Sequence, residues 1–398
     1  MAIYSLRIYD TELMRFSMAN NELGEPVANI LWIDEEHKHL LPIDMIYNDD
    51  DLLRWLKRRV IPKNRTFVEE ILETLGLRLN DTKGIIDVCK GLSLNDSYWI
   101  VPEDFDGKFA QYNLYENRFS EMLALVAYTG IGGSNEAFTT SPELTTNGML
   151  PKAWRFIDGD GIYLYKGGSS GFYNAGWEPY CEYYASQIAE TMQLNAVHYD
   201  LENWKGIVAS KCALFTDINT SYVQIGQIKR YGGMQVCLDY YDQLGEEFGE
   251  QLRSMLVFDA LIYNEDRHFG NFGILRDNHT GRIIAPAPIF DNGASLFCYA
   301  GRDRLGHLAE YAALRTPNHH GSFEDVCAAV MGPRQKEELR RMINFTFKRH
   351  PNPALNFPEE HLVEIERIIG NRVRQLLDTP IRENRRAKGK GIHDRETR

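Results

Sequence analysis

The sequence predicts an α+β protein: a small α/β module at the N-terminus, then a sheet-rich part, then a helix-rich part. Apolar and polar residues alternate with a period of two along residues 3–33 and in short runs between residues 154 and 225. The long apolar segments from residue 246 onward instead follow the helical period. The chain has 398 residues, which is enough for two or three domains of roughly 150 residues each.

The composition is that of a globular protein, with 43% hydrophobic, 25% charged and 12% aromatic residues. A net charge of -12 at pH 7 makes direct nucleic-acid binding unlikely and disfavours anionic membranes, because both repel a negative surface. The sequence has neither a long uninterrupted apolar segment nor a basic start followed by an apolar run, and the six cysteines are isolated. We therefore expect a cytoplasmic protein with reduced thiols and no membrane partner.

Residues 1–105 are expected to form the small N-terminal α/β module. The alternating runs within residues 3–33 predict strands, and "SYWIVPED" predicts one more strand up to the end of the module. Two helices are expected between these strands. The first, from residue 50, stops at Pro62, and the second begins with Asn64 as its cap and ends near Gly76.

Residues 106–218 are expected to form a sheet with one long helix. A first helix over 116–130 is followed by a polar loop rich in Gly and Thr, and then by the hairpin "WRFID" and "IYLYK". The long helix spans 177–194. The segments "VHYDLEN" and "GIVASKCALFT", with "SYVQI" just beyond residue 218, predict the remaining strands.

Residues 219–380 are expected to be mainly helical, with helices over 246–263, 333–350 and 358–379. Residues 381–398 form a basic tail that we expect to be disordered. Counted from residue 382, this tail has seven Lys and Arg against three acids, a net +4, and almost no apolar residues.

One segment of the helical part, "NEDRHFGNFGIL", combines polar side chains with apolar flanks. Asp266 follows the long helix, and Asn271 precedes a short apolar strand that ends in a turn at 277–281. A second apolar run then leads to Asp291, twenty positions after Asn271. Two antiparallel strands joined by that turn would place Asp291 beside Asn271, so we expect the three side chains to converge.

These three groups suit phosphoryl transfer. The amide of Asn271 and the carboxylate of Asp291 are oxygen ligands of the kind that Mg²⁺ prefers, and Asp266 remains free to act as a base. An Asp, an Asn five residues later and a downstream Asp-x-Gly have these roles in kinases. The same residues also allow a structural interpretation, in which Asp266 pairs with Arg267, His268 caps the helix and Asp291 begins an ordinary turn.

A kinase also needs groups that hold the nucleotide. Lys166 ends a predicted strand, and Glu182 on the following helix can orient it by an ion pair, with Glu178 or Glu190 as alternatives. Gly148 in "TTNGMLPKAW" allows the backbone to approach a phosphate closely. The remaining candidates for nucleotide binding are Lys152, His268, and Lys211 and Phe215 in "SKCALFT", the segment expected near the adenine base.

On these motifs the sequence resembles the HipA-like serine/threonine kinases, a bacterial family that includes toxin kinases of toxin–antitoxin pairs and CtkA-type kinases. The resemblance lies in "NEDRHFGNFGIL" with "APAPIFD", in "LYK" before a helix, and in Gly148 followed four residues later by Lys152. It implies a two-lobed protein-kinase-like fold. It also implies that Asp266 is the catalytic base, that Asn271 and Asp291 hold Mg²⁺, and that Lys166 contacts ATP.

The family's loop carries a serine, three residues before its glycine, that is autophosphorylated and switches the kinase off. Thr145 occupies that position here, with Thr146 beside it, so both are autophosphorylation candidates. The resemblance extends over residues 131–378. The first 130 residues do not resemble the family's N-terminal barrel.

We therefore expect an ATP- and Mg²⁺-dependent protein kinase that phosphorylates Ser or Thr, with an antitoxin-like protein as a possible partner. Alternatives are a phosphotransferase acting on a small molecule or a lipid head group, and a nucleotide-binding module without catalysis. A further alternative is a metal hydrolase built from Asp266, His268 and Asp291.

Overall fold

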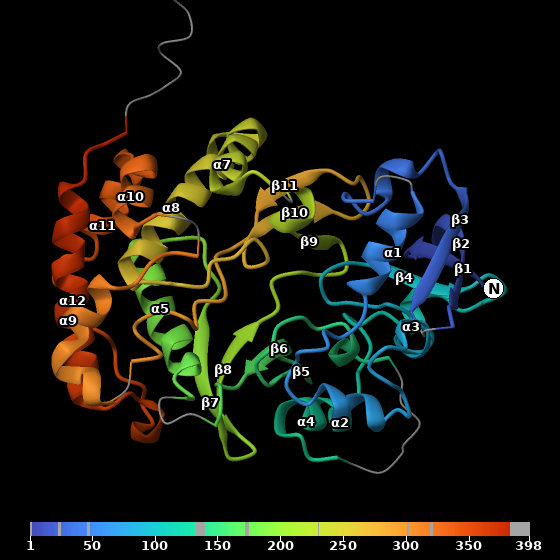
Figure 1. Ribbon diagram of the computed structural model, residues 1–398, viewed down its shortest axis with the longest axis horizontal. Coiled ribbons are helices and arrows are strands. Elements are labelled where there is room, and N and C mark those ends of the chain that lie inside the picture. Colours follow the sequence, from blue (N-terminus) through green and yellow to red (C-terminus); the bar gives the residue numbers. More distant parts are fainter. Residues whose placement is uncertain are drawn as a thin grey trace, which may run out of the picture.

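The computed structural model describes residues 2–22, 25–45, 48–132, 140–171, 175–229, 231–300, 302–318 and 321–382. The fold is α+β, with antiparallel sheets toward the N-terminal end of the molecule and most of the helices gathered at the opposite side (Figure 1). No helix in the described ranges has both the length and the apolar character needed to cross a bilayer. The basic tail lies outside the described residues from position 383 onward.

The first sheet has the order β3-β2-β1-β4 and is antiparallel throughout. Its strands are β1 (Ala2–Ile8), β2 (Thr11–Asn20), β3 (Pro26–Ile33) and β4 (Tyr98–Pro102). The helices α1 (Asp49–Lys57), α2 (Val68–Glu73) and α3 (Thr82–Cys89) lie between β3 and β4 in the chain. The predicted strands are confirmed. The predicted cap at Asn64 is wrong, because α2 begins only after Phe67, whose backbone is left-handed.

The second sheet has the order β5-β6-β8-β7. It consists of β5 (Lys152–Ile157), β6 (Gly161–Lys166), β7 (Tyr199–Trp204) and β8 (Ile207–Ala213). The helix α4 (Glu121–Thr129) packs against β5, and α5 (Glu178–Met192) packs against β7 and β8. The hairpin and the long helix were predicted. The helix expected from residue 116 begins later, because Ser120 caps α4 by accepting from the N–H of Leu123.

The third sheet has the order β11-β10-β9 and provides the hairpin that precedes Asp291. Its strands are β9 (Thr220–Gln224), β10 (Gly273–Asp277) and β11 (Ile283–Pro286). The antiparallel pairing of β10 with β11 confirms the hairpin predicted around the 277–281 turn. β9 was expected in the same sheet as β7 and β8, but it pairs with β10 instead, over the register from Thr220 to Gln224.

The helical part is arranged around α8, which is almost entirely buried (Figure 1). It contains α6 (Ile225–Ile228), α7 (Gly233–Leu244), α8 (Glu246–Ile262), α9 (Leu308–Ala313), α10 (Phe323–Val330), α11 (Pro333–Arg340) and α12 (Glu359–Asp378). α7, α10, α11 and α12 all contact α8. The largest apolar core lies here and includes residues of α5, α7 and α12.

The helix predicted over 333–350 is correct only as far as Arg340. Beyond it, side chains from other helices take the backbone donors that a continued helix would use. The N–H of Phe347 donates to Glu366 (2.9 Å) and the N–H of Lys348 donates to Gln187 (2.8 Å). Asn344 has a left-handed backbone, which also interrupts the helix. Tertiary hydrogen bonds therefore replace local ones in this segment.

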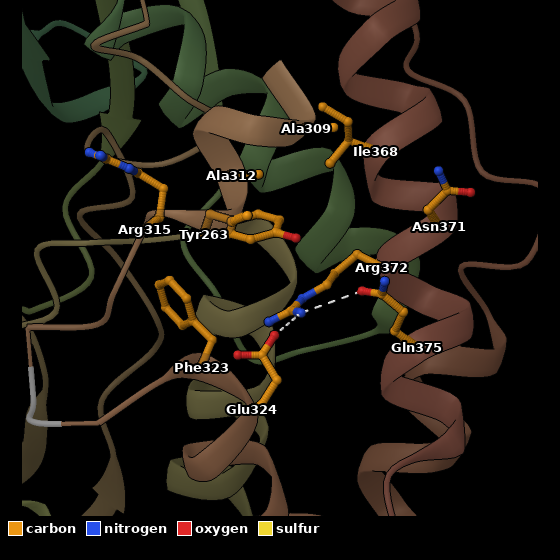
Figure 2. Close-up of a pocket in the computed structure, with 11 residues that line it drawn as sticks. Tyr263, Ala309, Ala312, Arg315, Phe323, Glu324, Ile368, Asn371, Arg372 and Gln375 are labelled. Atoms are coloured by element: carbon orange, nitrogen blue, oxygen red, sulfur yellow. Dashed lines mark hydrogen bonds and ion pairs between the residues drawn. The ribbon is translucent and has the colours of Figure 1, made fainter. Parts of the chain in front are cut away.

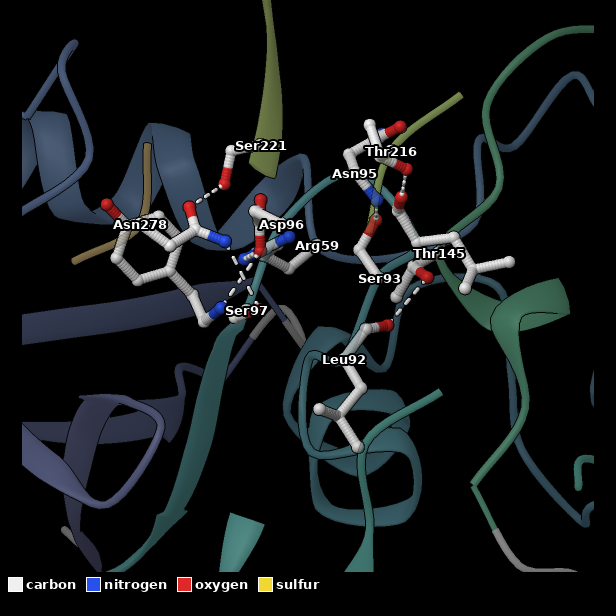
Figure 3. A network of polar contacts seen from close by, with 12 residues as sticks. Arg59, Leu92, Ser93, Asn95, Asp96, Ser97, Thr145, Thr216, Ser221 and Asn278 are labelled. Carbon is white, nitrogen blue, oxygen red and sulfur yellow. Dashed lines mark hydrogen bonds and ion pairs between the residues drawn. The ribbon is translucent and has the colours of Figure 1, made fainter. Parts of the chain in front are cut away.

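The segment Leu92–Ser97, between α3 and β4, connects the first sheet to the rest of the molecule; we call it the seam segment (Figure 3). Its backbone carbonyls accept hydrogen bonds from three separate parts of the chain. The hydroxyl of Thr145 donates to Leu92 (2.8 Å), that of Thr216 to Leu94 (2.5 Å), and the N–H of Tyr222 to Asn95 (2.8 Å).

The end of the seam segment is bound by side chains. The hydroxyl of Ser97 donates to the carbonyl of Ile218 (2.6 Å), and the amide of Asn278 donates to Ser97 (3.3 Å) and to the same carbonyl (3.0 Å). Apolar packing crosses the predicted boundary at residue 105 as well. One core cluster joins Ile71 and Ile85 to Leu123, and another joins Trp99 to Phe119, with Leu214 packed against it. The first 105 residues therefore share buried surface with the second sheet.

Candidate active site

A cavity of about 350 Å³ lies between the second sheet, α5, the loop after α8 and the segment after β11. The predicted site residues that line it are Asp266, Asn271, Asp291, Lys166, Glu182, Gly148, Lys152, Phe215, His268, Thr145 and Thr146. Lys211 is the one predicted site residue outside this lining. We call this cavity the cleft.

Lys166 lies at the centre of an ion-pair triad in the cleft. Its Nζ is 2.6 Å from Oε1 of Glu182 and 2.5 Å from Oδ1 of Asp291. Glu182 is 1% exposed, whereas the side chain of Asp291 is 36% exposed. Burial disfavours the ammonium, but the carboxylates of Asp291 and Glu182 outweigh this effect and raise the pKa of Lys166. Burial would also raise the pKa of Asp291, yet Lys166 and Lys152 hold it well below its usual range.

Local structure explains why these groups meet. Lys166 is the last residue of β6, and Glu182 faces it from the second turn of α5. Asp291 follows β11 with a left-handed backbone, and the N–H of the next residue, Asn292, donates to Oε2 of Glu182 (2.8 Å). Glu182 therefore binds both Lys166 and the backbone that presents Asp291. Of the alternatives, Glu190 is exposed, and Glu178 lines the cleft without pairing with Lys166.

Asp266 and Asn271 lie in the loop between α8 and β10. The side-chain amide of Asn271 donates to the backbone carbonyl of Asp266 (3.1 Å), which fixes the two ends of the D-x-x-x-x-N spacing. Asp266 is exposed at the mouth of the loop, and its carboxylate accepts a hydrogen bond from Asn318 (3.4 Å). Burial raises the pKa of Asp266; the charge of His268 opposes this increase and that of Asp291 adds to it.

Arg267 does not pair with Asp266, so that structural interpretation of the motif is wrong. Its guanidinium makes two 2.9 Å hydrogen bonds to the buried carboxylate of Asp259 on α8. It also donates to the carbonyl of Asn271 (3.0 Å), to Asn292 Oδ1 (2.6 Å) and to the carbonyl of Phe290. Arg267 thus connects α8, the Asp266 loop and the segment that carries Asp291. Asp259 is the lone acid in the apolar run "VFDALIY", and this pattern is the signal in the sequence that the acid is buried with a charged partner.

His268 lines the cleft and also shapes its own turn, since its Nδ1 accepts from the N–H of Gly270 (2.9 Å). It does not cap α8: Tyr263, with a left-handed backbone, ends that helix. Within the described residues, no three or more His, Cys, Asp or Glu side chains are grouped so as to hold a metal ion.

The loop before β5 forms another wall of the cleft. Gly148 has a positive φ of 95°, a conformation that strains any other residue. Lys152 is 7% exposed, and its Nζ donates to the carbonyl of Asn147 (2.9 Å). Burial, together with the nearby charge of Lys166, lowers the pKa of Lys152 to about 7, although Asp291 opposes this shift. The loop therefore holds a buried amine whose charge changes near neutral pH.

The hydroxyls of Thr145 and Thr146 are both engaged. Thr145 is buried and donates to the carbonyls of Leu92 (2.8 Å) and Pro142 (3.2 Å). Thr146 donates to the same Pro142 carbonyl (2.7 Å). In this conformation neither hydroxyl is free to accept a phosphoryl group.

β8 presents alternate residues to opposite faces of the second sheet. Ser210 and Cys212 line the cleft, whereas Lys211 points to the other face, where its Nζ lies 3.3 Å from Glu202 and 4.6 Å from the ring centre of Tyr163. The structure therefore contradicts the prediction that Lys211 faces the nucleotide. The predicted strand was right, but the face assigned to this lysine was not.

One part of the cleft wall was not predicted. Ser93, Leu94 and Asn95 of the seam segment line it, so the N-terminal module contributes directly to the site. No motif in the sequence reveals this contribution. Glu178, considered as an alternative partner of Lys166, instead has Oε2 bound to the N–H of Ser169 (3.1 Å) and a buried Oε1 that has no partner among the described residues.

Comparison with known proteins identifies the fold. No family model matches the sequence, and no curated protein matches it. Among solved structures, the chain is similar to HipA of Shewanella oneidensis MR-1, described as a toxin–antitoxin system of HipA, HipB and its operator DNA. The TM-score is 0.55 at 11% identity, over 95% of this chain and 100% of that chain. The chain therefore has a HipA-like fold.

A second similar structure is the proinflammatory kinase CtkA of Helicobacter pylori. The TM-score is 0.45 at 19% identity, over 59% of this chain and 91% of that chain. The HipA comparison corrects one expectation, because coverage of 95% necessarily includes most of the first 130 residues. The structural similarity is therefore not confined to residues 131–378.

Proposed function

We propose that the chain is an ATP- and Mg²⁺-dependent protein kinase that transfers the γ-phosphoryl group to a Ser or Thr hydroxyl. The observation that carries this proposal is the Lys166–Glu182–Asp291 triad in the same cleft as Asp266 and Asn271. A strand lysine paired with a helix carboxylate is a requirement of the kinase mechanism. The HipA-like fold supports the same class of reaction.

The proposal includes a two-lobed architecture. In it, residues 106–218 form the N-lobe with the Gly148 loop, and residues 219–380 form the helical C-lobe with Asp266. Residues 1–105 form an additional module, which through the seam segment also lines the cleft.

The donors in the cleft suit Mg²⁺ held jointly with a nucleotide. Asn271 and Asp291 offer amide and carboxylate oxygens, and an ion that keeps several waters and phosphate oxygens does not need a third protein ligand. Bound there, Mg²⁺ neutralises the charge of the phosphates during transfer. Lys166 would hold phosphate oxygens, and the Gly148 loop would cover them.

Asp266 would accept the proton of the attacking hydroxyl. Its raised pKa favours this role, because a base whose pKa is closer to the working pH takes up a proton more readily. Phe215, with Cys212 three residues earlier on β8, would give the cleft an apolar wall for the base of the nucleotide.

The test is phosphoryl transfer from ATP-Mg²⁺ to protein, followed by mass spectrometry of the purified chain and of a lysate. Asp266→Asn should reduce transfer by about 10²-fold or more while nucleotide binding persists, since the lost group acts on the proton. Asp239→Asn, on an exposed position of α7, is the matched control and should keep full activity. Full activity of Asp266→Asn would contradict the assignment.

The same assay separates the alternatives. Phosphorylated small molecules or lipid head groups without phosphoprotein would assign a different acceptor to the same site. Nucleotide binding without turnover would indicate a non-catalytic module. Asp291→Ala should lose Mg²⁺-dependent ATP binding in each of these cases, because the carboxylate belongs to the metal site and not to the acceptor.

Two regulatory features belong to the proposal. Autophosphorylation at Thr145 or Thr146 would require the loop to leave its position, since both hydroxyls are bonded. A phosphate on either residue, absent from the Asp266→Asn protein, would support it.

An antitoxin-like protein partner is suggested by the HipA–HipB complex among the similar structures. Co-purification of the natively expressed chain with a protein encoded by an adjacent gene would support this partner.

A further inference from the structure

A second cavity, of about 260 Å³, lies in the helical part between α9, α10 and α12 (Figure 2). None of the residues that line it also lines the cleft. Its walls are apolar on several sides, with Tyr263, Phe323, Ala312 and Ile368 among them. The exposed residues among those that line it are Ala309, Ala313, Glu324 and Gln375. We call it the α12 pocket.

Arg372 on α12 is the polar centre of this pocket. Its side chain is 4% exposed, and Figure 2 shows the guanidinium between Tyr263 and Glu324. Nε donates to the carbonyl of Ala260 (3.1 Å), and Nη1 is bound to Glu324 and, at 3.5 Å, to Gln375. Nη2 is also buried, but it has no acceptor among the described residues.

An unpaired donor on a buried cation is unfavourable, because a guanidinium stays charged and its N–H groups lose water without gaining an acceptor. Glu324 does not remove this cost, since it binds Nη1 with one oxygen and its side chain remains 64% exposed. The ring of Tyr263, whose centre lies 4.9 Å from the guanidinium, offers a π face and not a lone pair in the plane of Nη2. Nε of Arg315, another residue of the lining, is also buried without an acceptor among the described residues. The pocket therefore has two unsatisfied guanidinium donors, and its lining combines apolar residues with polar ones.

We propose that the α12 pocket binds a small organic oxyanion, a carboxylate or a phosphate carried on a compact apolar body. The oxyanion would accept from Nη2 of Arg372, and the body would lie against Tyr263 and Phe323. Arginine is the side chain best suited to planar recognition of carboxylate and phosphate groups. The binding site does not depend on the proposed kinase reaction.

The experiment is calorimetric titration of the full chain with four probes: benzoate, phenyl phosphate, inorganic phosphate and neutral benzamide. At least one aromatic anion should bind saturably, and at least tenfold more tightly than benzamide and inorganic phosphate. The stronger aromatic anion tells whether the site prefers carboxylate or phosphate. No saturable binding of either one, or equal binding of benzamide, would overturn the proposal.

Variants place the binding in this pocket. Arg372→Lys keeps the charge but loses Nη2, and Ala309→Leu enlarges an exposed side chain of the pocket lining with little risk to folding. Each should weaken binding of the aromatic anion at least tenfold. Arg374→Lys, an exposed arginine two residues away on α12, is the matched control and should bind as the parent does. Unchanged binding by both Arg372→Lys and Ala309→Leu, with thermal unfolding showing folded proteins, would contradict this location.

Discussion

Lys152 is a residue in the cleft whose charge changes near neutral pH. In the folded chain its pKa is lowered to about 7, chiefly by burial. In the unfolded chain a lysine has a pKa of about 10.4. Between these two values the unfolded state binds a proton that the folded state does not, so the free energy of unfolding contributed by this group rises with pH. Below about pH 7 the folded chain bears the full cost of the buried charge.

Lys152→Met should remove this dependence. The gain in unfolding free energy of the variant over the parent should be largest near about pH 6 and should shrink steadily toward about pH 10. Denaturant unfolding over this range measures it. Lys211→Met, on the opposite face of the second sheet, is the control and should give a nearly constant difference. If the difference in unfolding free energy between Lys152→Met and the parent does not change with pH, burial does not lower the pKa of Lys152 as stated.

Arg267 is the residue whose loss should disturb the most structure, since it joins Asp259, the Asp266 loop and the segment before Asp291. Arg267→Met leaves a buried carboxylate without its partner, which costs about 3–5 kcal/mol of unfolding free energy. Arg282→Met, an exposed position in the β10–β11 hairpin, should change it by less than about 0.5 kcal/mol. Chemical denaturation of both variants is the measurement, and a small loss in Arg267→Met would show that water replaces the guanidinium.

The sequence allowed the positions of the main cleft residues to be predicted where short-range geometry sets them. A tight loop fixes the spacing of Asp266 and Asn271, and a hairpin brings Asp291 back to them. The partners of Arg267 could not be predicted in the same way. They are the backbone carbonyls of Asn271 and Phe290, the side-chain amide of Asn292 and the buried acid Asp259, and together they follow no periodic pattern.

At the scale of elements, β8 shows why a correct strand can still carry a wrong site residue. Ala209, Ser210 and Cys212 are all buried, because β8 has packing on both faces. Alternation indicates the cleft face only when one face is exposed. The sequence therefore gave no basis for choosing between Ser210 and Lys211.

A pair of substitutions on β8 tests this assignment of faces. Ser210→Leu puts a larger side chain into the cleft and should weaken binding of an ATP analogue at least tenfold, whereas Lys211→Leu should leave it within about twofold. Fluorescence titration measures both, with thermal unfolding as the check on folding. Stronger loss in the Lys211 variant would reverse the assignment.

β9 and the segment after α11 deviate from prediction for a different reason. Their sequences allow the predicted local structure, but partners far along the chain determine the result. β9 pairs with β10, which begins at Gly273, and side chains of α5 and α12 bind the backbone after Arg340. Local propensity is a weak guide where tertiary hydrogen bonds compete with it.

At the scale of the whole molecule, the seam segment makes the first 105 residues part of the cleft. We therefore expect one cooperative unfolding transition, because the shared core and the buried hydrogen bonds must break together. Tryptophan fluorescence and far-UV circular dichroism should then give coincident denaturation curves. Two separated transitions would show that the N-terminal module folds and unfolds on its own.

Thr216→Val tests the same connection chemically. It leaves the buried carbonyl of Leu94 without its donor, which costs about 1–3 kcal/mol of unfolding free energy. Thr316→Val, at an exposed position after α9, is the isosteric control and should have little effect. Equal stability of the two variants in denaturant would mean that the seam contributes no net stabilisation.

The seam segment contributes mainly peptide carbonyls. Every residue supplies such a carbonyl, whatever its side chain. Position 95 is therefore free to change identity in evolution as long as the path of the main chain is kept, whereas positions 92 and 94 must stay apolar because Leu92 and Leu94 are buried in the core. Aligned relatives would show apolar residues at 92 and 94 and little constraint at 95, and a deletion in this segment would open the cleft. Insertions and deletions, more than substitutions, are the changes that natural selection should remove from this part of the gene.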